Sequence, residues 1–279
     1  PQPARRAVLP ALDPFTARTR RVEAFNRGAQ PLRYTASSSQ PWLRIHPEAG
    51  AIEDVVALSV EVDFAQLPPG EHRGDVVVRG DELTEVTIEV PVQVPNVDGE
   101  ARGFIEGDGH VVIEAAHFDH ATAPAGMAWE VIPNLGRTHA GVTTVPPNAA
   151  AVQPGGDSAR LEYAVHLHAE GEVEVRVHLS PTLDLQGSGG LRYAVSIGDE
   201  PPQIVRLQLE PSPGHRHYLA WEQAVADNVY VGRSRHRVKA GPQLLKLWRV
   251  DAGLVLQRIE LWRGAPPANC LGPVESPRL

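Results

Sequence analysis

Short runs of β-branched and alternating apolar and polar residues, separated by glycine and proline, are the feature that most constrains the fold. The clearest runs are Val76–Val78, Glu85–Val90 and Glu172–Val177. Alternation with period two places one face of a strand in a core and the other in water. The 25 glycines and 26 prolines interrupt these runs at short intervals, as turns between strands require. The pattern predicts an all-β fold, made of two antiparallel β-sandwiches in series.

Helical periodicity is scarce, and its best example, Ala220–Asp227, predicts a helix of at most two turns. The strand pattern stops between Val94 and Glu100 and resumes near Val111. A length of 279 residues also suits about two domains. We therefore predict a first sandwich over residues 1–97, a linker over 98–103, a second sandwich over 104–264 and a tail over 265–279. The tail is expected to run as an extended strap or to be mobile, and residues 8–12 to act as a connector to a preceding segment.

The charge of the chain argues against two classes of partner. Its formal net charge is −8, and neither half is basic. The electrostatic field of the chain therefore does not attract nucleic acid or anionic membranes. No apolar run approaches the roughly 20 residues that a membrane span needs. One cysteine, Cys270, excludes an intrachain disulfide. The chain begins at Pro1 without a signal pattern, and we expect a piece of a longer polypeptide.

The first domain carries a series of turn and strand motifs in a particular order. They are Phe25–Gly28, Pro31–Tyr34, Pro41–Leu43, Val60–Asp63, Leu67–Gly70 and Arg73–Val78. This order resembles the immunoglobulin-like modules of bacterial carbohydrate-active enzymes, including the BACON-like group. The resemblance implies an immunoglobulin-like spacer. Trp42, beside a proline at a strand start, is expected to fill the core, with a sugar-stacking surface as the alternative.

The second domain carries a longer series of motifs. They are Val111–Phe118, Trp129–Ile132, Leu135–Thr138, Leu161–Tyr163, Ser180–Leu183, Leu191–Asp199, Asp227–Val229, Leu245–Trp248, Val250–Ile259 and Leu271–Ser276. In this order and spacing the series resembles the C-terminal region of the xylan α-1,2-glucuronidases of glycoside hydrolase family 115. The resemblance implies a galactose-binding-like (jelly-roll) β-sandwich. It also implies a catalytic domain upstream of residue 1 and a secreted or periplasmic protein.

The resemblance bears on metal binding as well. Related sugar-binding sandwiches hold a structural calcium, and the candidate ligands here are Glu114 and Asp251. Calcium prefers several oxygen ligands, and Ala116 stands where the family pattern has a second acid. That departure weakens the case for calcium. No other cofactor is expected.

Four residues of the second domain are candidates for sugar binding. Sugar rings stack on flat aromatic faces, and planar polar groups bind their hydroxyls. An arginine can bind the carboxylate of a uronic acid at two points. The candidates are Trp129, Arg137, Trp221 and Asn228. The alternative is that both tryptophans pack in a core or an interface. Trp248 and Trp262 are expected in the core, and Arg192 in a structural ion pair.

No catalytic residue is expected within this chain. A glycosidase needs two carboxylates facing a cleft, whereas the acids here alternate along strands as solvated positions do. Ser188 lies in a glycine-rich stretch that favours a hairpin loop. The chain alone is not expected to be an enzyme, although its parent polypeptide is.

The sequence therefore predicts a non-catalytic C-terminal accessory region of a xylan α-1,2-glucuronidase. Its expected partners are its own upstream catalytic domain, glucuronoxylan and a second copy of the chain in a homodimer. The alternative is a free-standing extracytoplasmic module that binds a protein or acts in adhesion.

Overall fold

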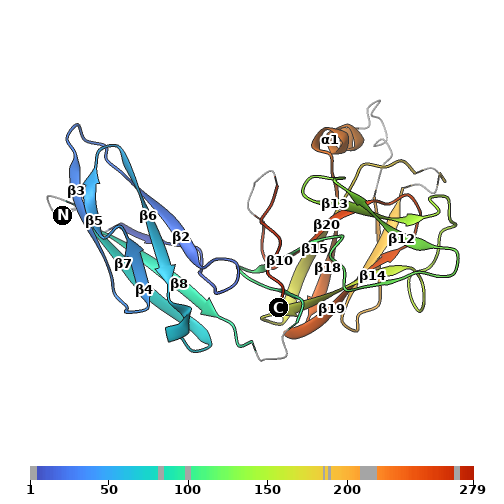
Figure 1. The fold of residues 1–279 in the computed structure, drawn as a ribbon, viewed down its shortest axis with the longest axis horizontal. Helices are drawn as coiled ribbons and strands as arrows, with labels where there is room; N and C mark the ends of the chain where they lie inside the picture. The colour runs from blue at the N-terminus through green and yellow to red at the C-terminus, as the bar shows by residue number, and fades with distance from the viewer. Residues whose placement is uncertain are drawn as a thin grey trace. The chain divides into compact units, whose positions relative to one another are not determined.

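A computed structural model describes residues 5–80, 85–97, 102–184, 186–187, 190–207, 219–266 and 271–279. The expectations for Ser188 and Cys270 lie outside these residues. The chain divides into two compact units, residues 1–99 and 100–279, which Figure 1 shows in blue to green and in green to red. No helix among the described residues is both long and apolar enough to cross a bilayer.

The first unit is a two-sheet β-sandwich. One sheet has the strand order β1-β8-β7-β3-β5 and the other β2-β6-β4. The elements are β1 (Arg5–Val8), β2 (Thr19–Phe25), β3 (Leu32–Ser38), β4 (Leu43–His46), β5 (Ala49–Ile52), β6 (Val55–Val62), the 3₁₀ turn Phe64–Gln66, β7 (Gly70–Gly80) and β8 (Glu85–Val94). The runs at Val76–Val78 and Glu85–Val90 lie in β7 and β8, as predicted.

The core between these sheets takes one face of each strand. Trp42 is buried in it, together with Tyr34 and Leu43, which confirms the expectation of a core role for Trp42. The expectation that residues 8–12 only connect is wrong. Leu12 is fully buried, its N–H donates to Pro91 O at 2.9 Å, and β1 pairs in parallel with β8. Without β1, strand β8 would lie at the sheet edge with unpaired backbone N–H and C=O groups. The pairing with β1 supplies their hydrogen-bond partners.

The second unit is also a two-sheet sandwich. Its elements are β9 (Phe104–Ile105), β10 (His110–Glu114), β11 (His120–Thr122), β12 (Ala128–Pro133), β13 (Ala140–Val145), β14 (Arg160–Leu167), β15 (Gly171–Leu179), β16 (Arg192–Ile197), β17 (Gln203–Arg206), α1 (Leu219–Asp227), β18 (Tyr230–Val238), β19 (Gly241–Arg249) and β20 (Leu256–Trp262). The β15 sheet has the order β12-β13-β20-β15-β18, with β10 also on β20. The β14 sheet has the order β11-β14-β19-β16-β17, with β9 also on β14.

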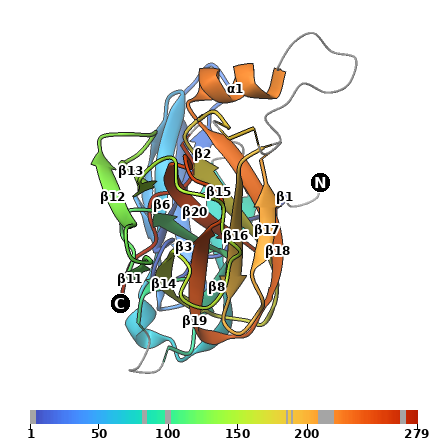
Figure 2. The same ribbon diagram turned by 90° about the vertical axis from the view of Figure 1, so that its right-hand side faces the viewer.

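The predicted fold class, all-β with two mainly antiparallel sandwiches in series, is confirmed. The core of the second unit includes Val173, Val175 and Val177, the apolar positions of the alternating run. Position 232 faces this core opposite Val177, and it is a glycine because the Tyr193 hydroxyl fills the space that a side chain would need. A Cβ there would lie 2.1 Å from Tyr193 Oη. The predicted short helix is confirmed as α1, which lies at one end of the second unit (Figure 2).

β15 and β16 follow each other in the chain but belong to different sheets of the sandwich, so these two strands do not pair as a hairpin. Ser188 itself, in the predicted hairpin loop, lies outside the described residues. Alternation within each strand is the same for a hairpin and a crossover, which is why the sequence pattern did not separate them.

The last residues, 271–279, form an extended segment that we call the C-terminal strap. Ser276 N–H donates to Val112 O at 2.9 Å, and the Ser276 hydroxyl accepts from Val112 N–H at 3.0 Å. Ile105 N–H donates to Pro277 O, and Leu279 and Gly103 exchange backbone bonds in both directions. The strap thus binds β10 and β9 on the edges that the sheets leave open.

Candidate functional site

The outer face of the β15 sheet presents a row of charged side chains across three neighbouring strands. Residues opposite each other in paired strands share a face of the sheet. Arg176 of β15 lies opposite Arg233 of β18 on one side and opposite Glu260 of β20 on the other. Their neighbours Val175, Val177 and Leu261 point into the core. Two arginines therefore stand side by side on the surface, next to one acid.

These side chains line a pocket of about 110 Å³ on the outer face. We call it the arginine pocket. Its lining residues are Arg137, Arg176, His178, Val231, Arg233, Glu260, Trp262, Pro266, Leu271, Gly272 and Pro273. The sheet forms the floor, the β12–β13 connection supplies Arg137, and the C-terminal strap forms a wall. Arg258 fixes that wall by donating to the carbonyl oxygens of Leu271 and Pro273.

The position of Arg137 is set by the buried side chain of Gln257. Arg137 N–H donates to Gln257 Oε1 at 3.1 Å, and Gln257 Nε2 donates to Asn228 O and Ser180 Oγ at 3.0 Å. The turn before Arg137 passes through Gly136 at φ +105°, where a Cβ would lie 2.9 Å from Gln257. Only glycine adopts such a conformation freely. The structure thus brings two predicted residues, Arg137 and Asn228, to the same glutamine.

Two of the three arginines in the pocket have no ion-pair partner among the described residues. Arg176 Nε donates to Glu174 Oε1 at 2.6 Å. The side chains of Arg137 and Arg233 have no hydrogen bond or ion pair within the described part of the chain. Arg137 and Arg233 therefore keep their side-chain N–H donors available at the pocket.

Glu260, the acid among the lining residues, is committed to other partners. It accepts from Trp262 Nε1 at 2.9 Å and lies 3.2 Å from Arg258 Nε and 3.5 Å from His178 Nε2. Burial alone would raise its pKa, but His178, Trp262 and Arg258 outweigh burial and lower the pKa to about 2. Glu260 is therefore an anion over the whole physiological range and cannot act as a proton donor there.

A second, adjoining pocket of about 280 Å³ shares Arg176 and Trp262 with the arginine pocket. Its lining residues are Glu172, Glu174, Arg176, Arg235, Trp262, Arg263, Gly264 and Ala265. Together the two form what we call the outer-face groove. Trp262 is buried, but it lies on the outer face of the β15 sheet and not in the core as expected. Its ring stacks on His110 with ring centroids 4.7 Å apart, so little of its face is open to a ligand.

The other predicted sugar-binding residues lie apart from the pocket lining. Trp129 on β12 is half-buried against the core, and its Nε1 donates to Thr122 O at 3.0 Å. Trp221 is half-buried on α1, and Asn228 is exposed just after α1 at φ +53°. Their role in binding stays a prediction. Trp248 is buried, with Nε1 donating to Ser196 Oγ at 3.0 Å, as expected for a packed residue.

The two candidate calcium ligands each hold an arginine. Asp251 accepts from Arg192 Nε at 2.9 Å and Nη2 at 2.8 Å, which confirms the expected ion pair of Arg192. Glu114 accepts from Thr138 Oγ1 at 2.8 Å and lies 3.7 Å from Arg258 Nη1. Among the described residues, no cluster of three or more metal-binding side chains is present. A calcium ion at either carboxylate would have to displace its cationic partner.

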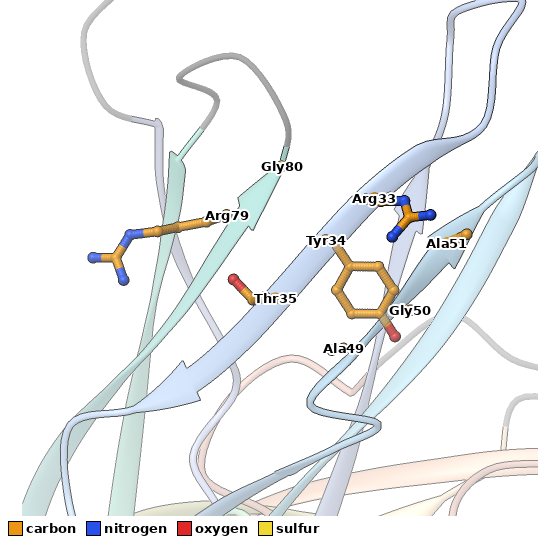
Figure 3. A pocket seen from close by; sticks show the side chains of 8 residues that line it. All are labelled: Arg33, Tyr34, Thr35, Ala49, Gly50, Ala51, Arg79 and Gly80. Carbon is orange, nitrogen blue, oxygen red and sulfur yellow. The ribbon is translucent and has the colours of Figure 1, made fainter.

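The first unit has a wider depression of about 560 Å³ on its five-stranded sheet. Figure 3 shows Arg33 and Arg79 on opposite sides of it, with the Tyr34 ring against Gly50. Burial raises the pKa of Tyr34, and Arg79 is held by Glu85 at 2.8 Å. Small residues make up much of its lining, and the one aromatic side chain there, Tyr34, is buried.

The pocket residues missed in the sequence, Arg176 and Arg233, left a partial signal. Arg176 occupies a polar position of the alternating run, and Arg233, Arg235 and Arg237 alternate along β18. Each run predicts an exposed face with arginines. The pairing that sets Arg176 opposite Arg233 joins segments far apart in the sequence, and no local pattern encodes it.

Comparison with known proteins decides the family. The model of the glycosyl hydrolase family 115 C-terminal domain matches residues 103–275. The chain belongs to this family. The match spans β9 through most of the C-terminal strap, and so includes the outer-face groove. No curated protein matches the chain.

Solved structures give weaker likenesses. A family 115 4-O-methyl-α-glucuronidase with specificity for decorated arabinogalactans has a TM-score of 0.40 at 18% identity, over 55% of this chain and 17% of that one. A family 35 carbohydrate-binding module from Cellvibrio japonicus has a TM-score of 0.37 at 13% identity, over 58% of this chain and 99% of that one. An isomalto-dextranase from Arthrobacter globiformis has a TM-score of 0.37 at 12% identity, over 91% of this chain and 35% of that one. The family assignment depends on the family model alone.

Proposed function

We propose that this chain is a non-catalytic accessory region of a xylan α-1,2-glucuronidase and that it binds the polysaccharide through the outer-face groove. The catalytic domain lies elsewhere in the parent polypeptide, and a secreted or periplasmic location belongs to the same proposal. The observation that carries it is the groove itself. It is an open depression, lined by several arginines of which Arg137 and Arg233 have no ion-pair partner among the described residues, on the unit that carries the family match.

A second observation supports the non-catalytic part of the proposal. Glycosidases use one carboxyl group as a general acid, kept protonated by a raised pKa. The buried carboxylates described in the second unit are Glu106, Glu114, Asp251 and Glu260. Each pairs with an arginine: Arg263 for Glu106, Arg258 for Glu114 and Glu260, and Arg192 for Asp251. Of these four, only Glu260 lines the outer-face groove, and its pKa is lowered to about 2, the wrong direction for a general acid.

The binding half of this proposal is tested by affinity electrophoresis of the whole chain in native gels that contain glucuronoxylan. We expect retardation that grows with polysaccharide concentration and is absent in gels with a neutral β-glucan. In parallel, the chain should release no glucuronic acid from aldouronic oligosaccharides. Equal mobility in all gels would reject the binding role, and release of glucuronic acid would reject the non-catalytic assignment.

A further inference from the structure

We propose that the arginine pocket is a carboxylate subsite. In it Arg137, Arg176 and Arg233 bind the acid group of a uronic acid branch on a glycan. The inference rests on the proposed function, because it names the ligand class of the same groove. Its first support is charge. Three guanidinium groups line a pocket of about 110 Å³, and the one acid of the lining is already held by three other groups.

The second support is the donors left unused. Arg137 and Arg233 make no side-chain hydrogen bond within the described residues, and Arg176 uses its Nε for Glu174. Each guanidinium carries five N–H donors in a fixed planar fork, which fits the two oxygens of a carboxylate. Arg137 and Arg233 therefore have donors available for an anion that binds next to Arg176.

The third support is the shape around the pocket. The arginine pocket is small, whereas the adjoining pocket is larger and lined by Glu172, Glu174, Arg235 and Arg263. Alternating acids and arginines suit sugar hydroxyls, which both donate and accept hydrogen bonds. The two pockets thus suit one glycan, with its uronic acid branch in the arginine pocket and its polysaccharide backbone in the larger, adjoining pocket. The net charge of −8 gives no long-range attraction for an anion, so recognition depends on these contacts.

Calorimetry of the whole chain with two matched probes tests the carboxylate. One probe is a xylo-oligosaccharide that bears glucuronic acid, and the other is the same molecule with its carboxyl group reduced to an alcohol. We expect reduction to weaken binding about 10-fold or more, because hydrogen bonds to charged groups are the strong ones. Equal affinity for both probes would overturn the inference while leaving glycan binding intact. Tighter binding of a sulfated oligosaccharide than of the uronic acid probe would also overturn it.

Variants then test the residues. Arg233 is exposed on the edge strand β18, so Arg233→Ala is expected to fold with an unchanged thermal midpoint. Arg233→Ala should weaken the binding of the acid probe about 10-fold and leave the binding of the reduced probe unchanged. Arg233→Lys should restore part of the lost affinity.

Arg237→Ala is the matched control, because Arg237 lies on the same strand and face but outside the pocket lining. If Arg237→Ala lowers the affinity for the acid probe as much as Arg233→Ala does, the assignment of the carboxylate subsite is wrong. If the wild type binds neither probe and no polysaccharide, the proposed function itself fails.

Discussion

At the scale of single residues, the second unit contains a buried histidine with a shifted pKa. His236 on β18 has its Nδ1 3.0 Å from Glu200 Oε2 and its Nε2 2.8 Å from Ser234 Oγ. Burial lowers the pKa of His236, and Glu200 only partly offsets this effect. The neutral ring suits the site, because Nδ1–H can donate to Glu200 while Nε2 accepts from the serine hydroxyl.

The shift at His236 predicts how stability depends on pH. In the unfolded chain a histidine titrates near its ordinary pKa of about 6.5, and in the folded protein it titrates lower. Its contribution is therefore complete above the unfolded pKa, falls as pH drops through that value, and stops changing below the folded pKa. Urea unfolding at a series of pH values from 8 to 4 should show a steeper loss for the wild type than for His236→Gln. Parallel curves for the two proteins would contradict the assignment.

At the scale of elements, the C-terminal strap completes the second unit. It supplies backbone partners to β10 and β9 and forms one wall of the arginine pocket. Glu275 of the strap accepts from Glu114 N–H at 2.8 Å, and His117 Nδ1 lies 2.9 Å from the same carboxylate. The strap is therefore held by polar contacts on both of its sides, and the groove depends on its position.

The hydroxyl of Ser276 should carry a measurable share of that stability. It accepts from the N–H of Val112, which is fully buried, and Ser276 is itself buried. Ser276→Ala would leave that N–H without a partner, at a cost of about 1–3 kcal/mol. Ser276→Thr keeps the hydroxyl and is the matched control. The free energy of unfolding in urea measures both, and an equal effect of the two substitutions would show that the hydroxyl is not the cause.

The sequence predicted the elements better than their pairing. The alternation at Glu172–Val177 is sufficient to place β15, and the short helix is found at α1. The parallel pairing of β1, the placement of β15 and β16 in different sheets and the opposition of Arg176 and Arg233 all depend on strands meeting across long stretches of chain. Such contacts are decided by the summed burial of the sandwich, and they leave no local pattern.

At the scale of the whole molecule, the chain is two sandwiches with different features. The first unit has a core that includes Trp42 and a depression on its five-stranded sheet. The second unit carries the family match and the outer-face groove.

Chemical-shift mapping tests the central claim, that the outer-face groove is the glycan site, most directly. The whole chain, labelled with ¹⁵N, would be titrated with a xylo-oligosaccharide that bears glucuronic acid. We predict that the shifted backbone amides cluster around Arg137, Arg176, Arg233 and Leu271. A cluster around Trp129 or Trp221 instead, or no shifted amide at saturating oligosaccharide, would contradict the claim.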